Sequence, residues 1–162
     1  LEDNATLKAR SAQTDLRRKE FFTCPNHAGD QMNGYILKPT NFDPSKRYPV
    51  VMTQYSGPGS QSVLDKWTID WEYYLVSKGF IVACVDGRGT GGRSRAYETS
   101  VYMQLGKLET EDQVAGAEYM RTLPYVDDKH IGIYGWSYGG YETLMAMSTS
   151  NGTYQALSLI HI

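Results

Sequence analysis

Apolar residues along the chain are concentrated in short runs, and loops rich in glycine, proline and polar residues separate these runs. Three runs are almost continuously apolar, as expected for strands of a sheet that is buried on both faces. They lie at residues 49–55, 80–85 and 130–135. A helix is predicted after each of them, at residues 67–78, 109–122 and 138–149. This alternation predicts an α/β fold with a doubly wound, mostly parallel sheet, whose strand carboxyl ends lie at one edge.

The first predicted helix begins at Trp67. Its apolar residues Trp67, Trp71, Tyr74 and Leu75 recur at helical spacing. Gly79 follows the last turn and is a natural terminator, because glycine adopts the left-handed conformation that ends many helices. We therefore predict a helix that extends over the full range 67–78.

The N-terminal part of the chain predicts a hairpin that precedes the sheet. Residues 17–23 and 31–38 have the character of strands, and the Pro-Asn-His-Ala-Gly-Asp sequence between them is typical of a turn. Residues 1–16 are polar and are interpreted as a lead-in. The predicted α/β domain itself covers residues 17–156.

Composition and charge exclude some classes of partner. The formal net charge is −2, so no basic surface for nucleic acid or an anionic membrane is indicated. No run approaches the roughly 18 apolar residues that a membrane-spanning helix needs. The chain starts without Met, a basic segment or an apolar leader, and we interpret it as an internal piece of a longer protein. The sequence therefore does not indicate the cellular compartment of the protein.

The two cysteines, Cys24 and Cys84, both lie inside apolar runs. We predict that both pack inertly in the core, because free cysteine is among the most buried residue types. A disulfide between them is the alternative that the sequence leaves open. Two cysteines do not form a disulfide framework, so they do not indicate a redox compartment.

The clearest chemical signal is the Gly-Trp-Ser-Tyr-Gly sequence at residues 135–139. It lies between a predicted buried strand and a predicted helix, which is the setting of a nucleophile elbow. In such an elbow a strained turn exposes the serine hydroxyl above the edge of the sheet, so Ser137 is the predicted nucleophile. The backbone N–H of Tyr138, the next residue, is then placed to stabilise a tetrahedral oxyanion.

The acid and base that would complete a catalytic triad are not visible. In α/β-hydrolases both follow the serine along the chain. After Ser137 the sequence contains no Asp, its one acid is Glu142 on the elbow helix, and its one histidine is His161. We do not assign His161 as the base, and we interpret His27 and His130 as surface histidines. The triad Asp and His are therefore absent from this chain, which we predict to be nearly inactive by itself.

A second glycine-rich segment offers a competing interpretation. Residues 87–92 match the G-x-G-x-x-G pattern of dinucleotide-binding turns and follow a predicted strand. Asp86 at the end of that strand would repel a pyrophosphate, and no clean amphipathic helix begins after Gly92. We therefore favour a flexible loop that turns away from the end of the strand.

Three segments together carry a resemblance to a known family. They are residues 55–60 (Tyr-Ser-Gly-Pro-Gly-Ser), 86–91 (Asp-Gly-Arg-Gly-Thr-Gly) and 135–140 (Gly-Trp-Ser-Tyr-Gly-Gly). They resemble the catalytic domain of the prolyl oligopeptidase family, in particular the dipeptidyl peptidase IV branch. The predicted hairpin and residues 42–46 (Phe-Asp-Pro-Ser-Lys) also resemble this branch, especially its bacterial members. The fold implied is an α/β-hydrolase that is truncated after the nucleophile helix.

The resemblance implies a serine peptidase that removes N-terminal dipeptides with Pro or Ala in second position, without metal or cofactor. Ser137 would form the acyl-enzyme, the Tyr138 amide would bind the oxyanion, and Tyr55 matches the position whose phenol is the second oxyanion donor. Residues 1–16 would lead from an upstream propeller-like domain, which holds the substrate amine in the family. The resemblance further implies a peptide substrate, a homodimer of the full-length parent, and a periplasmic, membrane-associated or extracellular location.

Two other functions stay open at this point. An esterase of the same fold would use the same serine on acyl esters. A non-catalytic binding module would keep the fold but lack the triad in its full-length form, although a binding module has no need for a strained serine. Finally, residues 157–162 (Leu-Ser-Leu-Ile-His-Ile) depart from the small apolar strand expected after residue 156, and we interpret them as a foreign or artefactual tail.

Overall fold

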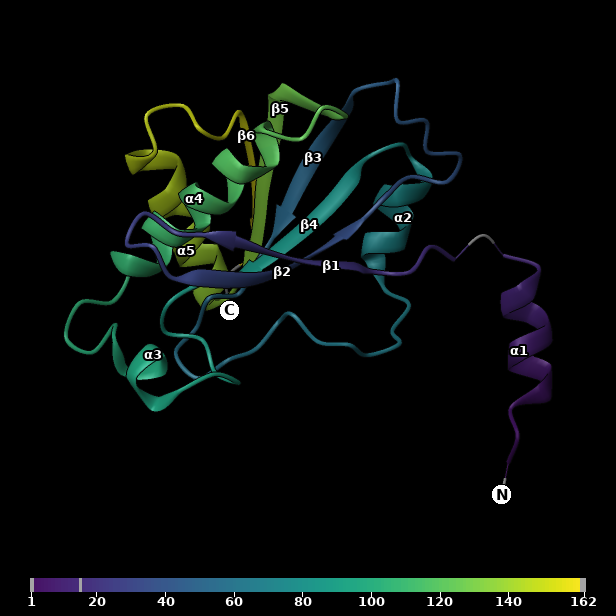
Figure 1. Ribbon diagram of the computed structural model, residues 1–162, viewed down its shortest axis with the longest axis horizontal. Coiled ribbons are helices and arrows are strands. Elements are labelled where there is room, and N and C mark those ends of the chain that lie inside the picture. Colours follow the sequence, from purple (N-terminus) through teal and green to yellow (C-terminus); the bar gives the residue numbers. More distant parts are fainter. Residues whose placement is uncertain (1, 15, 161–162) are drawn as a thin grey trace.

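The computed structural model describes residues 2–14 and 16–160, and within these residues the chain forms a six-stranded sheet flanked by helices (Figure 1). The strands are β1 (Glu20–Pro25), β2 (Gln31–Leu37), β3 (Tyr48–Thr53), β4 (Ile81–Asp86), β5 (Val126–Trp136) and β6 (Ala156–Ile160). The helices are α1 (Ala5–Ala12), α2 (Trp71–Ser77), α3 (Arg95–Thr99), α4 (Leu108–Arg121) and α5 (Tyr138–Thr149). The three predicted buried strands correspond to β3, β4 and β5, and the predicted hairpin corresponds to β1 and β2.

The strands are arranged in the order β1-β2-β4-β3-β5-β6. β1 pairs with β2 and β2 with β4 in antiparallel fashion, while β4, β3, β5 and β6 are parallel neighbours. The parallel part places the carboxyl ends of β3, β4 and β5 at one edge, as the sequence predicted. The loops that follow these strands therefore meet there.

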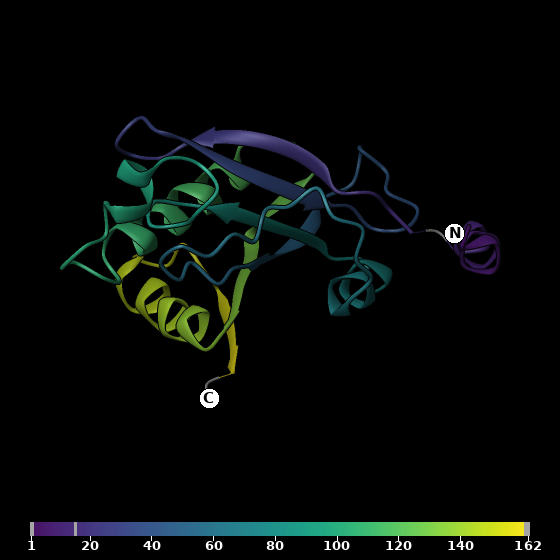
Figure 2. The same ribbon diagram turned by 90° about the horizontal axis from the view of Figure 1, so that it is seen from below.

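Helices cover both faces of the sheet. α4 and α5 lie side by side on one face, and α2 lies on the other (Figure 2). Each face has its own apolar cluster, because successive strand residues point to opposite sides: Ala83 belongs to the α4–α5 cluster, whereas Val82 and Cys84 belong to the α2 cluster. α1 buries no residue and lies apart from the sheet in both views (Figures 1 and 2).

The helix predicted from Trp67 begins later than expected, at Trp71. Asp70 is its N-cap, and the Asp70 side chain accepts a hydrogen bond from a first-turn amide at 3.0 Å. Trp67 and Tyr74 are 61% and 63% exposed, while Val76 is buried. The predicted start was wrong because the aromatic spacing was taken as helical from Trp67 onward, whereas the cap at Asp70 sets the first turn.

The predicted surface histidines are confirmed at His27 and His130. β5 begins at Val126, earlier than predicted, so His130 lies within the strand, but its side chain is exposed and its Nδ1 is 2.7 Å from Oδ2 of Asp127. His27 is half-exposed, and its Nε2 is 2.7 Å from Oε2 of Glu118. His161 lies outside the described residues.

The sheet continues for one strand beyond the nucleophile helix, which is further than the sequence predicted. Residues 157–160 belong to β6, which pairs in parallel with β5 from Gly132 and Ala156 to Trp136 and Ile160. β6 forms the edge of the sheet in the described part of the chain, and Ile160 is mostly exposed. The interpretation of this segment as a foreign tail stays a prediction.

The predicted burial of both cysteines is confirmed, and neither forms a disulfide. Cys24 and Cys84 belong to clusters on opposite faces of the sheet. Burial, and to a lesser extent the charge of Asp112, raises the pKa of Cys24 to about 11, and burial also raises the pKa of Cys84. We expect both thiols to resist a disulfide reagent at mildly alkaline pH until denaturant is added, because the thiolate is the reactive form. Stoichiometric labelling of the native chain would contradict this burial.

Among residues 2–14 and 16–160, no helix has the length and apolar character needed to cross a bilayer.

Candidate active site

Ser137 occupies the turn between β5 and α5. Its backbone has φ 54° and ψ −118°, a left-handed conformation that residues with a Cβ rarely adopt. The Ser137 carbonyl accepts hydrogen bonds from the amides of Gly140 at 2.9 Å and Tyr141 at 3.2 Å, which hold the turn in place. A strained serine on a tight strand-to-helix turn is the geometry of a nucleophile elbow, as the motif predicted.

The glycines of the motif are required by close backbone contacts. A Cβ on Gly139 would lie 2.5 Å from the Gln54 carbonyl oxygen and 3.0 Å from the Tyr55 Cα. A Cβ on Gly135 would overlap the Gly139 carbonyl oxygen. The elbow therefore fits directly against the end of β3, and larger residues at these two positions would push the two segments apart.

Tyr138 is the first residue of α5, so its amide has no carbonyl partner within the helix. Its side chain points to the interior, where the phenol donates a hydrogen bond to Oε1 of Glu109 at 2.8 Å. Burial and the charge of Glu109 both raise the pKa of this phenol. The side chain is thus held in the interior, while the backbone N–H, which has no partner among the described residues, lies beside Ser137.

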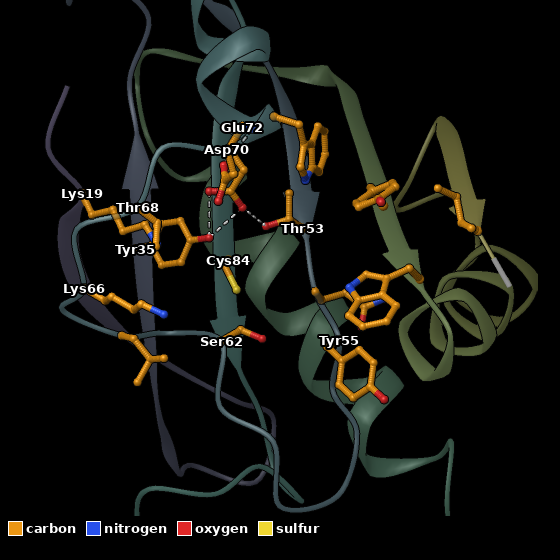
Figure 3. Close-up of a pocket in the computed structure, with 16 residues that line it drawn as sticks. Lys19, Tyr35, Thr53, Tyr55, Ser62, Lys66, Thr68, Asp70, Glu72 and Cys84 are labelled. Carbon is orange, nitrogen blue, oxygen red and sulfur yellow. Dashed lines mark hydrogen bonds between the residues drawn. The ribbon is translucent and has the colours of Figure 1, made fainter. Parts of the chain in front are cut away.

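Tyr55 is the second residue after β3 and is half-buried at the edge of the sheet where Ser137 lies (Figure 3). Its ring centroid lies 5.2 Å from that of Trp136 and 6.4 Å from that of Tyr138, the two residues that flank Ser137. The structure therefore brings Tyr55 next to the elbow, although these residues are far apart in the sequence. A phenol at this position is chemically suited to donate to an oxyanion.

A cavity of about 560 Å³ opens beside the elbow and extends toward α2 (Figure 3). Tyr55 and Trp136 line its end near Ser137, but Ser137 itself is not among the lining residues. At the other end Glu72 accepts hydrogen bonds from the hydroxyls of Tyr35 at 2.8 Å and Thr53 at 2.9 Å. Burial raises the pKa of Glu72. Through these two hydrogen bonds Glu72 holds α2 against β2 and β3.

The described residues do not supply a base for Ser137. His27 pairs with Glu118 and His130 pairs with Asp127, both away from the elbow. In the same part of the chain, no cluster of His, Cys, Asp and Glu side chains is suited to hold a metal ion. What the structure assembles is the candidate nucleophile and the two candidate oxyanion donors.

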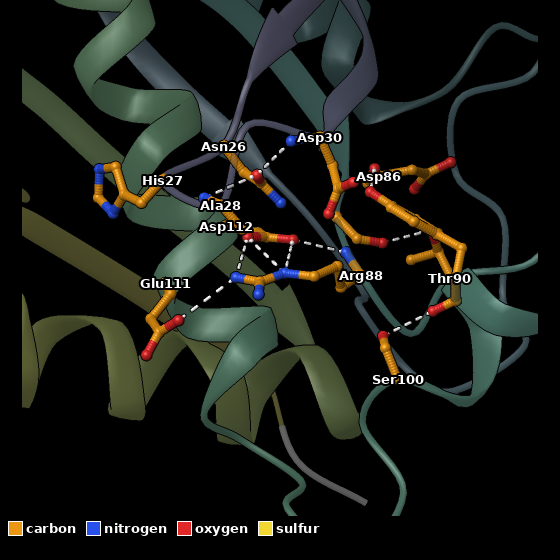
Figure 4. A network of polar contacts seen from close by, with 12 residues as sticks. Asn26, His27, Ala28, Asp30, Asp86, Arg88, Thr90, Ser100, Glu111 and Asp112 are labelled. Carbon is orange, nitrogen blue, oxygen red and sulfur yellow. Dashed lines mark hydrogen bonds and ion pairs between the residues drawn. The ribbon is translucent and has the colours of Figure 1, made fainter.

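The glycine-rich loop at residues 87–92 is held in place by contacts on two sides. Arg88 forms a buried ion pair with Asp112 of α4, with Nη2 2.7 Å from Oδ1 (Figure 4). On the other side the Gly59 amide donates to the Gly89 carbonyl, and the Gly91 amide donates to the carbonyl of Ser60, both at 2.8 Å. These contacts support the loop that follows Tyr55.

The dinucleotide alternative is not supported by this arrangement. Asp86 at the end of β4 accepts hydrogen bonds from the amides of Ser62 at 3.0 Å and Val63 at 2.8 Å. Burial nevertheless raises the pKa of its carboxyl. The Asp86 carboxyl is thus held at the end of β4 by the loop at residues 62–63, where its charge would repel a pyrophosphate. The Arg88–Asp112 pair is the feature of this region that the sequence analysis missed.

Comparisons with known proteins agree with this geometry. The model of the family described as "Prolyl oligopeptidase family" matches residues 67–159. The chain is 39% identical to a "Probable dipeptidyl-aminopeptidase B" of Metarhizium robertsii, over 94% of the chain and 17% of that protein. It is also 39% identical to a "Probable dipeptidyl peptidase 4" of Emericella nidulans, over 95% of the chain and 20% of that protein.

The crystal structure of Porphyromonas gingivalis dipeptidyl peptidase 4 superposes on this chain with a TM-score of 0.93 and 52% sequence identity. The match covers 97% of the chain and 22% of that protein. The chain therefore spans about a fifth of the length of the relatives that it matches.

Proposed function

The chain belongs to the prolyl oligopeptidase family, and from this premise we propose that it is the nucleophile-bearing part of a serine peptidase that removes N-terminal dipeptides. The observation that carries the proposal is the strained Ser137 between β5 and α5, with the backbone amide of Tyr138 and the ring of Tyr55 beside it. Peptides with Pro or Ala in second position are the proposed substrates.

In the proposed reaction the Ser137 hydroxyl oxygen attacks the carbonyl carbon that follows the second residue. The hydroxyl proton passes to a base that lies outside the described residues. The tetrahedral oxyanion accepts hydrogen bonds from the Tyr138 amide and the Tyr55 phenol, which act where charge develops in the transition state. The intermediate then expels the shortened peptide, whose amine takes the proton from the base, and leaves an ester on Ser137. Water hydrolyses this acyl-enzyme and releases the dipeptide.

The test is hydrolysis of a Gly-Pro anilide by the protein at its full natural length, alongside a simple acyl ester. Preferential cleavage of the anilide supports the dipeptidyl peptidase. Faster hydrolysis of the ester would favour the esterase, and neither activity, together with no phosphonate labelling of Ser137, would favour the binding module. Light scattering on the same protein tests the proposed homodimer.

Tyr55→Phe tests the second oxyanion donor. Because the ring keeps its contacts with Trp136 and Tyr138, only the hydroxyl is lost. We expect kcat for the anilide to fall by about 10²-fold with little change in KM, since the oxyanion is absent from the bound substrate and develops in the transition state. Tyr102→Phe, in an exposed loop, is the matched control and should behave as the wild type. A kcat for Tyr55→Phe within a few-fold of the wild type would remove Tyr55 from the mechanism.

A further inference from the structure

Two buried glutamates lie behind the elbow and take no part in the mechanism above. Glu142 is on α5, the helix that begins after Ser137, and it is fully buried. Glu109 is on α4 and is 1% exposed. Two buried carboxyl groups that interact cannot both ionise without a large free-energy cost, so their environments are expected to separate their protonation states.

Glu109 accepts a hydrogen bond at each of its carboxyl oxygens. The Tyr138 phenol donates to its Oε1 at 2.8 Å, and the Gly106 amide donates to its Oε2 at 3.1 Å. A backbone amide can only donate, and a carboxylate can only accept. Of the two glutamates, Glu109 is therefore the one that accepts hydrogen bonds.

Glu142 instead donates a hydrogen bond, and the two contacts of the Thr110 hydroxyl show why. The Thr110 Oγ1 lies 2.8 Å from the Gly106 carbonyl oxygen and 2.8 Å from Oε2 of Glu142. The hydroxyl has one hydrogen, and the carbonyl can only accept. With a proton on Glu142 both contacts are hydrogen bonds, whereas without that proton one of them brings two lone pairs together. The second oxygen, Oε1 of Glu142, is buried and has no partner within the described residues, which also disfavours the charged form.

The electrostatic surroundings act in the same direction. Burial, and to a lesser extent the charge of Glu109, raises the pKa of Glu142 to about 7. The charged and titratable groups that face Glu142 are Glu109 from α4 and Tyr138 from its own helix. Within the described residues no cation from β5, β6 or the adjoining loops offsets this effect. The positive end of the α5 dipole acts mainly on the first turn, and Glu142 lies in the second.

We propose that Glu142 is protonated in the folded protein and that, by donating this proton to Thr110, it positions the nucleophile helix against α4. Glu142 touches no reacting atom and acts through the helix that begins at Tyr138. Tyr138 and Glu142 lie one turn apart and both bind α4, through Glu109 and Thr110 respectively. The two hydrogen bonds thus hold α5 against α4 at two points, and Glu109 and Glu142 together carry one carboxyl proton. Loss of this proton would place two carboxylates behind the elbow and weaken the contact between Glu142 and Thr110.

The protonation state is measured by carbon NMR titration of the glutamate carboxyl groups in the whole chain. The Glu142 signal is identified by its absence in Glu142→Gln. We expect this signal to stay in its protonated position at about pH 5.5 and to titrate near 7. A signal that titrates with the exposed glutamates, near the ordinary value of 4.5, would overturn the proposal. The wild-type chain alone decides this outcome if the variant does not fold.

The positioning role is measured by amide hydrogen exchange in α5, with wild type and Glu142→Gln compared at the same pH. The folded pKa of Glu142 lies above its unfolded value, so its contribution to stability falls as the pH rises from 4.5 and is lost above about 7. Glutamine mimics the neutral acid and can still donate to Thr110. We expect equal exchange at about pH 5.5 and several-fold slower exchange in Glu142→Gln than in wild type at about pH 8.5.

Glu20→Gln is the matched control, because Glu20 is an exposed acid paired with Lys38. It should match the wild type in α5 at both pH values. Equal exchange in Glu142→Gln and wild type at both pH values, or faster exchange in the variant at both, would contradict the positioning role. These measurements need neither substrate nor base, so their outcome is independent of the proposed peptidase activity.

Discussion

Asp112→Ala is expected to lower the free energy of unfolding by about 3–5 kcal/mol, because it leaves the mostly buried guanidinium of Arg88 without its main partner. Asp112 is fully buried, and the Arg88 side chain that faces it is 11% exposed (Figure 4). Arg88 donates from Nη2 at 2.7 Å and from Nε at 3.1 Å, and its backbone amide donates to the same carboxylate at 2.6 Å. All of these bonds end on one side chain. Chemical denaturation of the chain and the variant measures the loss.

Glu111→Ala is the matched control for this prediction. Glu111 is the neighbour of Asp112 on α4 and also contacts Arg88, at 3.3 Å, but its side chain is 43% exposed. Its removal should cost less than about 1 kcal/mol, as is usual for solvated ion pairs. The double variant Arg88→Met/Asp112→Ala should lose less than the sum of the two single changes, because no unpaired charge remains. Equal losses for Asp112→Ala and Glu111→Ala would show that the buried pair is not a major source of stability.

The effect of this ion pair extends to the candidate active site. Arg88 belongs to the loop at residues 87–92, which is joined by two backbone hydrogen bonds to the loop that follows Tyr55. The buried pair thus fixes the first loop to α4, and the first loop supports the second. Asp112→Ala should therefore also weaken the placement of Tyr55, a group that the pair never touches.

The sequence predicted the parallel strands and the elbow well, because both depend on local pattern. A continuous apolar run indicates burial on both faces, and β4 is buried at every position. α5 was predicted at residues 138–149 and is observed at Tyr138–Thr149, since the glycine-rich turn defines where it begins. The placement of Tyr55 at the same edge followed from the carboxyl end of β3 and from the family resemblance.

The features that were missed depend on contacts between distant segments. Apolar periodicity treats polar residues as solvent-facing, yet Glu109, Asp112 and Gln113 of α4 are all buried. Their burial is explained by partners that the spacing cannot reveal, such as Arg88, which is 24 residues away from Asp112. The late start of α2 is different, because Asp70 directly before Trp71 is a recognisable capping signal that outweighs the aromatic spacing.

Ser137→Ala is expected to have the largest effect on activity. In the protein at its full natural length, kcat for a dipeptidyl anilide should fall by about 10⁶-fold, because the proposed acyl-enzyme forms on the Ser137 hydroxyl. Initial rates with active-site titration measure this loss. Ser148→Ala, an exposed serine near the end of the same helix, is the matched control and should retain full activity. Substantial activity in Ser137→Ala would refute the nucleophile assignment.

The same position also carries backbone strain, which gives this assignment a test that needs no substrate. Alanine keeps the Cβ and therefore the unfavourable conformation at φ 54°, whereas glycine adopts it freely. Strain of about 1–3 kcal/mol is offset in part by the roughly 0.5–1 kcal/mol of extra chain entropy that glycine loses on folding. Ser137→Gly should therefore be more stable than Ser137→Ala by about 1 kcal/mol in chemical denaturation. A less stable glycine variant would mean that the turn is unstrained, and the serine would then lack the conformation that exposes a nucleophile at the edge of the sheet.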